Sequence, residues 1–241
     1  MSLAESFPRR RMTRPQRAAA AAMRAWLTLR YRVLSRRYDR LVLERIDGVP
    51  LVVLPQVFNP VLLRTGAFMA RALARSPLAR PGADALDLGT GSGVGAVFAA
   101  RRGARVLAVD INPEAVRCAR INALLNQLDD RVDVRQGDLF EPAAGQAFDL
   151  VIFNPPFYRG APSGNLDHAW RGQDVFERFA AGLAGALKPG GRALLVLSSD
   201  GDGRELLDLL RAAGFAIGVV VEKDLVNEVL TIYEVGGSQV L

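Results

Sequence analysis

The chain has 241 residues, half of them hydrophobic and 23% charged, which is enough for one α/β domain with a substantial core and an appendage. No apolar run approaches the ~18 residues that a membrane-spanning helix needs. The single cysteine, Cys118, cannot form an internal disulfide, and no group of cysteine, histidine and carboxylate residues has the spacing of a metal site. This composition indicates a reducing compartment, the cytoplasm.

Positive charge is concentrated at the N-terminus. Residues 1–45 hold twelve arginines and three acidic residues, a net charge of +9, whereas the other 196 residues carry 19 basic and 22 acidic side chains, a net charge of −3. Residues 14–40 are rich in alanine, leucine and arginine, which predicts one or two helices. We expect a basic helical extension over residues 1–47 and the main domain over 48–241. The extension is interpreted as a solvated basic helix, an RNA-binding arm, a partner-docking segment or a cover for the ligand side.

A glycine-rich loop follows the first predicted strand of the main domain. Residues 85–88 form a short apolar strand, which leads into Gly89-Thr90-Gly91-Ser92-Gly93-Val94-Gly95 and then into a predicted helix over residues 96–102. Glycines at a strand-to-helix turn permit positive φ angles and let a ligand approach the backbone. A dinucleotide-binding fingerprint would need its third glycine at position 94, where this chain has valine.

The next two predicted strands end in acidic residues. The strand over residues 105–109 is followed by Asp110, 21 residues after Gly89, and an acid at this place suits the ribose hydroxyls of an adenosyl cofactor. The strand over residues 132–135 is followed by Gly137-Asp138-Leu139, where the carboxylate suits an exocyclic adenine amine. Each acid alone is also typical of a turn or cap. Between these strands, residues 113–126 are predicted to form a helix with Cys118 in the core.

An Asn-Pro-Pro-Phe segment follows the fourth predicted strand, residues 148–153. Pro155 and Pro156 lack a backbone N–H, and Asn154 is driven into an extended conformation by the proline after it. The segment therefore offers hydrogen-bond acceptors and almost no donors. The Asn154 side-chain oxygen and the Pro155 carbonyl suit the two N–H groups of a substrate NH2, and Phe157 suits stacking on a planar amide or base. Standing alone, such a segment is more often a simple turn.

Helix and strand signals alternate through the rest of the chain. We predict a helix over residues 172–187 that ends at Lys188-Pro189-Gly190-Gly191, a strand over 192–197, a helix over 204–213, and consecutive strands over 216–221 and 229–235. This alternation is typical of a mostly parallel sheet with helices on both faces, and ligands of such sheets bind beyond the carboxyl ends of the strands. The last two strands leave no room for a helix between them, so we expect an antiparallel pair at the sheet edge.

Taken in this order, the motifs resemble class I S-adenosylmethionine-dependent methyltransferases, and the Asn-Pro-Pro-Phe segment is similar to the subgroup that methylates planar nitrogens. Three further stretches, residues 56–60 (QVFNP), 168–172 (HAWRG) and 175–179 (VFERF), are similar to the HemK-related N5-glutamine methyltransferases, particularly the archaeal and eukaryotic branch that modifies release factors. The resemblance covers roughly residues 48–235. It implies a Rossmann-like, mostly parallel seven-stranded sheet with helices on both faces and an antiparallel last strand.

The resemblance also implies S-adenosylmethionine as the cofactor, no metal, and a set of site residues. The positions that match the cofactor motifs are Asp87, Gly89, Thr90, Gly91, Gly93, Asp110, Ile111, Asp138, Leu139 and Asn154. The positions that match the catalytic motif are Asn154, Pro155, Pro156 and Phe157.

The methyl acceptor is less tightly specified than the cofactor. The family branch has an acid at the place of Asn59 and further acids after the proline. At the latter positions, residues 61–64, this chain has three apolar residues and then Arg64. The expected acceptor is a glutamine in a protein, such as a release factor or a ribosomal protein, and the alternative is an exocyclic base amine of rRNA or tRNA. Other interpretations are an NAD-dependent reductase and a non-catalytic partner-binding module. His168, the sole histidine, is either structural or a proton acceptor.

Overall fold

The computed structural model describes residues 40–156, 158–159, 171–172, 174–225 and 228–237. The predicted N-terminal helices lie almost wholly outside these ranges, and so do Phe157 and His168. Among the helices that the structure describes, none is both long and apolar enough to cross a membrane.

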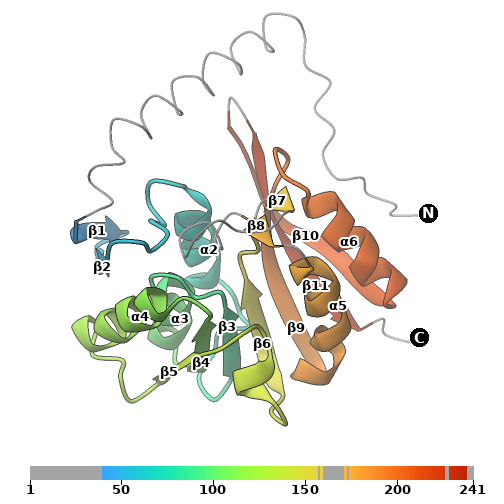
Figure 1. Cartoon of the computed structure of the whole chain (residues 1–241). Helices are drawn as coiled ribbons and strands as arrows, with labels where there is room; N and C mark the ends of the chain where they lie inside the picture. The colour runs from blue at the N-terminus through green and yellow to red at the C-terminus, as the bar shows by residue number, and fades with distance from the viewer. Residues whose placement is uncertain (1–39, 157, 160–170, 173, 226–227, 238–241) are drawn as a thin grey trace, which may run out of the picture.

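A seven-stranded sheet forms the centre of the domain (Figure 1). Its strand order is β10-β11-β9-β6-β3-β4-β5, and β11 runs antiparallel to the other six strands. The last strand thus lies one position inside the edge, between β9 and β10. The predicted Rossmann-like sheet with an antiparallel last strand is confirmed. The strands are β3 (Asp84–Leu88), β4 (Arg105–Asp110), β5 (Val132–Gln136), β6 (Phe148–Phe153), β9 (Leu187–Ser198), β10 (Phe215–Asp224) and β11 (Val229–Gly237). Two short strands, β7 (Tyr158–Arg159) and β8 (Arg171–Gly172), pair separately.

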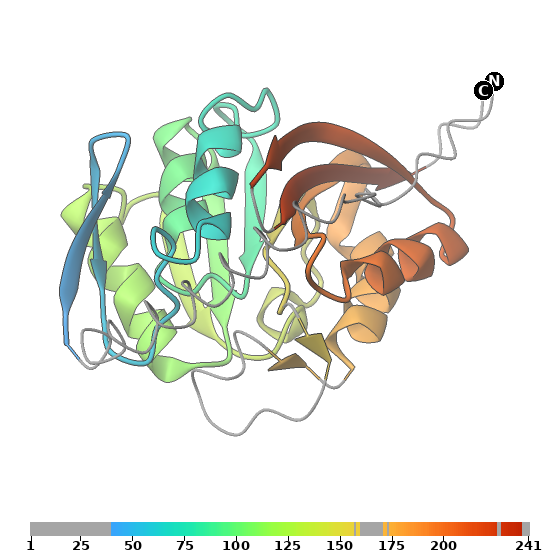
Figure 2. The ribbon, with the colours of Figure 1, turned by 90° about the horizontal axis from the view of Figure 1, so that it is seen from above.

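Helices cover both faces of this sheet (Figure 2). Successive side chains of a strand point to opposite faces, so the central strands contribute to two separate cores. In β3, for example, Ala85 belongs to the core beneath α2, α3 and α4, whereas Leu86 belongs to the core beneath α5 and α6. The helices are α2 (Thr65–Leu73), α3 (Val94–Arg101), α4 (Pro113–Leu125), α5 (Val175–Ala186) and α6 (Gly203–Ala212), with the short 3-10 turn η1 (Glu141–Ala143) after β5.

A β-hairpin precedes the sheet. Its strands, β1 (Val42–Ile46) and β2 (Val49–Val53), are joined by Asp47 and Gly48, whose φ angles of 47° and 85° are those of a type I′ turn. The predicted domain boundary between residues 47 and 48 falls inside this turn. Because the two strands form a single hydrogen-bonded unit, we propose that the domain begins ahead of β1.

The hairpin lies beside α4 (Figure 2), and the buried amide side chain of Asn122 makes several of the hydrogen bonds that join them. Asn122 accepts a hydrogen bond from the Val52 N–H at Oδ1 and donates one to the Val52 carbonyl from Nδ2, both at 2.7 Å. The same Nδ2 lies 2.7 Å from the carbonyl oxygen of Ser92, directly before α3. Asn122 therefore connects the hairpin to the glycine-rich loop.

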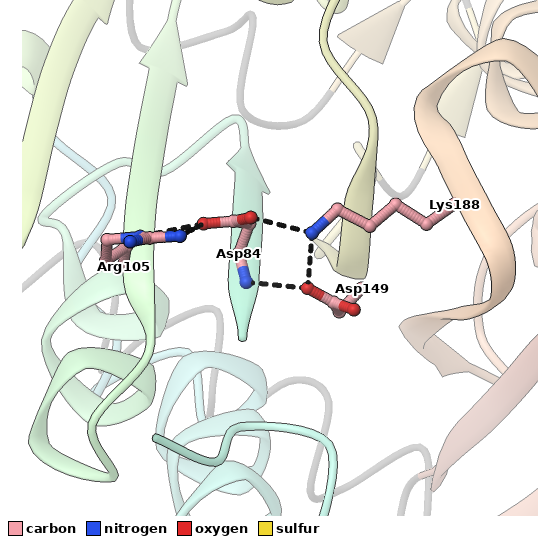
Figure 3. A network of polar contacts seen from close by, with 4 residues as sticks. All are labelled: Asp84, Arg105, Asp149 and Lys188. Carbon is pink, nitrogen blue, oxygen red and sulfur yellow. Dashed lines mark hydrogen bonds and ion pairs between the residues drawn. The ribbon is translucent and has the colours of Figure 1, made fainter. Parts of the chain in front are cut away.

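A network of charged side chains lies at the amino-terminal ends of the parallel strands, opposite their carboxyl ends (Figure 3). The Lys188 ammonium lies 2.7 Å from the carboxylate of Asp84 and 2.8 Å from that of Asp149. Asp84 also pairs with Arg105 at 2.8 Å, and its backbone N–H donates to Asp149 at 2.8 Å. The hydrogen bonds from Lys188 lower the pKa of both carboxyl groups, and the same contacts raise the pKa of Lys188. The network links β3, β4, β6 and β9 at their amino-terminal ends.

Strand β9 begins earlier than the sequence predicted. The segment Lys188-Pro189-Gly190-Gly191 was expected to be a turn before the strand, but β9 starts at Leu187, which pairs with Phe148 of β6. The register shifts directly after this pair. A Cβ added to Gly191 would lie 2.7 Å from the Phe148 carbonyl oxygen. The glycines therefore form a bulge within the strand, close against its neighbour.

Candidate active site

The carboxyl ends of four neighbouring strands open onto one cavity, as expected for a sheet of this kind. The cavity has a volume of about 280 Å³ and is lined by the segments after β3, β4, β5 and β6, by residues 56–58 and Pro60, and by parts of α2 and α5. Gly93 and Pro155 are not among the lining residues, and Phe157 lies outside the described ranges. The predicted site residues that line the cavity are Asp87, Gly89, Thr90, Gly91, Asp110, Ile111, Asp138, Leu139, Asn154 and Pro156.

Glycines serve two purposes in the loop after β3. Gly89 and Gly91 have φ angles of 59° and 57°, and a Cβ at either position would meet no atom closer than 3.9 Å. Their backbone is therefore open to a ligand in the cavity. Gly93 precedes α3, and a Cβ there would lie 2.9 Å from the Ala119 Cα of α4. This third glycine permits close helix packing, which explains why it does not line the cavity.

A buried carboxylate holds the glycine-rich loop against α3. Asp87 is 4% exposed, and its Oδ2 accepts hydrogen bonds from the Thr90 hydroxyl at 2.6 Å and from the Ala96 N–H at 2.8 Å. Gly95 leaves room for this carboxylate, since a Cβ there would lie 2.6 Å from the Asp87 Oδ1. Burial raises the pKa of Asp87 to about 7, because desolvation disfavours the charged form. Asp87 therefore lines the cavity and also fixes the glycine-rich loop through its hydrogen bonds to Thr90 and α3.

Asp110 joins the glycine-rich loop to the loop after β4. Its Oδ2 accepts from the Gly91 N–H at 2.8 Å and its Oδ1 accepts from the Asn112 N–H at 2.9 Å. An ionised carboxylate accepts several hydrogen bonds, and Asp110 lines the cavity. Asn112 caps α4 by accepting from the Glu114 N–H at 3.0 Å, and it donates to the Gln56 carbonyl at 2.9 Å. This last bond holds the segment after β2 at the cavity wall.

Asp138 is paired with an arginine that the sequence did not single out as a site residue. Arg178, in the first turn of α5, lies 2.7 Å from the Asp138 Oδ2, and both side chains line the cavity. The second contact of Arg178 is with Asp174, at 3.6 Å. Its hydrogen bond to Asp138 raises the pKa of the Arg178 guanidinium. The pairing depends on how α5 docks against the β5 loop, and no local sequence signal specifies it.

Asn154 has one satisfied and one unsatisfied side-chain group. Its Nδ2 donates to the Thr65 hydroxyl at 3.4 Å, whereas its buried Oδ1 has no hydrogen-bond partner in the described part of the chain. Leaving a buried acceptor unpaired costs ~1–3 kcal/mol, so the arrangement favours a ligand that donates here. Thr65, the first residue of α2 and 1% exposed, was missed by sequence reasoning.

Asn59 and Arg64, which replace acids of the family branch and so favour the RNA alternative, make contacts within the protein. Asn59 is 4% exposed, donates to the Glu44 carboxylate at 2.9 Å, and accepts at Oδ1 from the N–H groups of residues 61–62, each at 3.0 Å. Arg64 forms an ion pair with Glu228 at 3.4 Å. Asn59 is therefore a turn residue, and the two replacements no longer argue for contact with RNA.

The chain matches a known family over most of its length. Residues 51–216 match the family model described as the methyltransferase small domain. The chain belongs to this family. The matched segment contains all four strand ends that meet at the cavity. The domain is therefore an S-adenosylmethionine-dependent methyltransferase, as its motifs predicted, and not an NAD-dependent reductase.

Relatives of this methyltransferase domain fall into more than one substrate class. It is 30% identical over 183 residues to a Methanocaldococcus jannaschii protein provisionally named a protein N5-glutamine methyltransferase, a match that covers 72% of this chain and 88% of the relative. It is 35% identical over 160 residues to the ribosomal RNA small subunit methyltransferase C of Alcanivorax borkumensis, which covers 66% of this chain and 45% of the relative. The chain spans half or less of the length of several bacterial relatives.

Solved structures share the fold. Trm5 of Methanocaldococcus jannaschii, crystallised in complex with adenosine, superposes with a TM-score of 0.60 at 18% identity, covering 83% of this chain and 56% of Trm5. At this identity the likeness concerns the fold alone.

Proposed function

We propose that this methyltransferase acts on a planar nitrogen, and that the nitrogen belongs to a glutamine side-chain amide of a protein. The observation that carries the proposal is the buried Oδ1 of Asn154, which has no partner among the described residues and belongs to a residue that lines the cavity. An acceptor at this place suits an N–H donor on the substrate. The archaeal relative, named for N5-glutamine methylation, supports an amide as that donor.

The residues around the cavity fit an adenosyl cofactor. The bare backbone of residues 89–91 would lie against its amino-acid portion, and Asp110 would accept hydrogen bonds from the ribose hydroxyls. Ile111 and Leu139 would flank the adenine, and Asp138 would accept a hydrogen bond from its amine. When bound, S-adenosylmethionine supplies an electrophilic methyl group carried on a positively charged sulfur.

Asn154 and Pro155 would bind and orient the acceptor nitrogen. An amide nitrogen is a poor nucleophile because its lone pair is delocalised into the carbonyl. Hydrogen bonds from its two N–H groups to the Asn154 Oδ1 and the Pro155 carbonyl would orient the nitrogen and stabilise the positive charge that develops on it. Thr65 supports this role by accepting from the Asn154 Nδ2. The nitrogen then loses one proton to solvent, and Phe157 would stack on the amide plane.

An exocyclic base amine of RNA is the alternative acceptor, because it is also a planar nitrogen and an RNA methyltransferase is among the relatives. Two observations disfavour it. Asn59 and Arg64 are engaged with internal partners, and residues 46–241 carry a net charge of −3, which opposes a phosphate backbone. A non-catalytic binding module is disfavoured by the intact Asn154 and glycine-rich loop.

The proposed setting is the cytoplasm. Release factors, ribosomal proteins and rRNA are all parts of the translation apparatus. Cys118 is buried, and burial raises its pKa to about 11, so the thiol is protonated at neutral pH. A chain with this single cysteine does not depend on an oxidising compartment.

Methyl-labelled S-adenosylmethionine offers the direct test. The purified protein is incubated with labelled cofactor and, in parallel reactions, with release factors, ribosomal proteins, rRNA and tRNA, and Asn154→Ala serves as the control. We expect label in protein, on a glutamine nitrogen identified by mass spectrometry, and a strong loss of label with the variant. Label that enters only RNA would replace the glutamine proposal with the RNA alternative.

A further inference from the structure

We propose that Arg178 is a positioning residue that sets selectivity for adenine, by holding the Asp138 carboxylate so that one of its oxygens faces the base. The proposal rests on the adenosyl cofactor of the methyltransferase family and is independent of the identity of the methyl acceptor. Nothing in the family match or the named relatives assigns a role to Arg178.

The backbone of the Asp138 loop is fixed by its own hydrogen bonds. The Gly137 N–H donates to the Asp110 carbonyl and the Glu141 N–H donates to the Asp138 carbonyl, each at 3.0 Å. A Cβ on Gly137 would lie 2.3 Å from the Pro142 ring, which shows how tightly the loop closes on itself. The conformational freedom that remains at Asp138 therefore lies in its side chain.

Arg178 removes that side-chain freedom. Its guanidinium lies 2.7 Å from the Asp138 Oδ2, whereas the Asp138 Oδ1 takes no hydrogen bond from any described residue. Arg178 is itself held at the start of α5, where its N–H donates to the Asp174 carbonyl at 3.0 Å and its guanidinium lies 3.6 Å from the Asp174 carboxylate. The Asp138 side chain is 32% exposed, so without Arg178 it would be free to rotate toward solvent.

An oriented carboxylate discriminates between two purines that are nearly identical in shape. An ionised carboxylate only accepts hydrogen bonds. The 6-amino group of adenine donates to it, whereas the 6-oxo group of hypoxanthine is an acceptor and faces it with like partial charge. A site built to bond a ligand N–H rejects the analogue that lacks it, because the protein acceptor then faces the ligand without a donor. The strength of this rejection depends on the carboxylate being held in place.

Other ion pairs of the domain supply a matched comparison. Arg211 and Asp208 on α6 are 3.0 Å apart, they are more exposed than Arg178 and Asp138, and neither lines the cavity. Removing Arg211 therefore costs a surface ion pair without touching the ligand, and such pairs contribute little to stability.

The test compares the binding of S-adenosylhomocysteine and its deaminated analogue S-inosylhomocysteine by calorimetry, with the full-length protein, Arg178→Ala, Arg178→Lys and Arg211→Ala. We expect Arg178→Ala to lose roughly tenfold in affinity for the adenine ligand and less than about threefold for the hypoxanthine ligand, so that selectivity collapses. Arg178→Lys keeps the charge and should recover part of the selectivity, and Arg211→Ala should leave both affinities unchanged.

A double-mutant cycle separates positioning from a general loss of structure. If Arg178 acts through Asp138, removing Arg178 from an Asp138→Ala protein should not change the selectivity further. Melting temperatures identify any variant that fails to fold, and Arg178→Lys then carries the comparison. Equal weakening of the two ligands, or unchanged binding of both, would overturn the proposal. Neither result would bear on the choice between glutamine and RNA as methyl acceptor.

Discussion

The backbone N–H of Gly91 donates a hydrogen bond of 2.8 Å to the carboxylate of Asp110. Through this contact the acid at the end of β4 fixes the glycine-rich loop after β3, and the same acid lines the cavity. The proposed ribose-binding residue is thus also part of the framework that shapes the cavity. A change at Asp110 should therefore affect both cofactor binding and the order of the loop.

We predict that Asp110→Ala weakens the binding of S-adenosylhomocysteine by about 10- to 100-fold, the scale for losing hydrogen bonds to a charged acceptor. Calorimetry gives the affinity. Asp133→Ala is the matched control, because Asp133 is an exposed acid on the neighbouring strand and does not line the cavity. Unchanged affinity in the Asp110 variant would show that this residue stabilises the turn and does not bind the cofactor.

The buried Asp87 should make the stability of the fold depend on pH. Its folded-state pKa of about 7 lies above the ordinary aspartate value of about 3.9, so between these pH values the folded state holds a proton that the unfolded state releases. The free energy of unfolding should therefore fall as the pH rises through this window, by up to about 1.4 kcal/mol per pH unit, and show no further change from this group above it.

Urea unfolding of the wild type and Asp87→Asn at several pH values between 4 and 8 isolates this contribution, because asparagine does not titrate. As the pH rises to 7, the free energy of unfolding of the wild type should fall relative to that of Asp87→Asn. Parallel pH profiles would show that the Asp87 carboxyl ionises with an ordinary pKa.

Two helical glycines should respond to alanine in opposite ways. A Cβ at Gly95 would lie 2.6 Å from the Asp87 carboxylate, whereas a Cβ at Gly185 would meet nothing within 4 Å. Gly95→Ala should destabilise the fold by about 1–3 kcal/mol and weaken cofactor binding, since the loop must shift. Gly185→Ala should stabilise it by about 0.5–1 kcal/mol through helix propensity. Thermal and urea unfolding measure both, and equal effects would contradict the steric argument.

The Lys188 network should contribute to the stability of the fold without changing the affinity for the cofactor. Lys188 lowers the pKa of Asp84 and Asp149, so its stabilising effect should be present above their ordinary value of about 3.9 and be lost as the pH falls through their lowered values. Lys188→Gln should accordingly lower the melting temperature at neutral pH and converge with the wild type in strong acid. Its affinity for S-adenosylhomocysteine should be unchanged, because the network lies at the opposite end of the strands (Figure 3). A pH-independent difference would contradict the ionic account.

The site was predictable where its residues lie next to local signals. Asp110, Asp138 and Asn154 each come at or just after the end of a predicted strand. Parallel strands share one carboxyl edge, so the sequence pattern predicted that these residues meet at one cavity. The Asp47-Gly48 pair between apolar runs is likewise a local signal, in this case for the hairpin.

The contacts that could not be predicted arise from tertiary packing. Helix α2 begins after Arg64, whose φ is 64°, and no side chain caps it, so the sequence carries no start signal for the helix that brings Thr65 to Asn154. The Arg178–Asp138 pair likewise joins two segments that meet only when α5 docks on the sheet.

The measurement that bears most directly on the central claim is the turnover of the Asn154→Ala variant at saturating S-adenosylmethionine, with the protein that the wild type methylates as substrate. The affinity of the variant for S-adenosylhomocysteine is measured in parallel. Asn154 is proposed to contact the acceptor nitrogen through an otherwise unpaired buried oxygen. We predict a fall in kcat of at least ~100-fold, the scale for losing one group that stabilises the transition state, with cofactor affinity nearly intact. A variant that turns over at the wild-type rate would remove Asn154 from the mechanism.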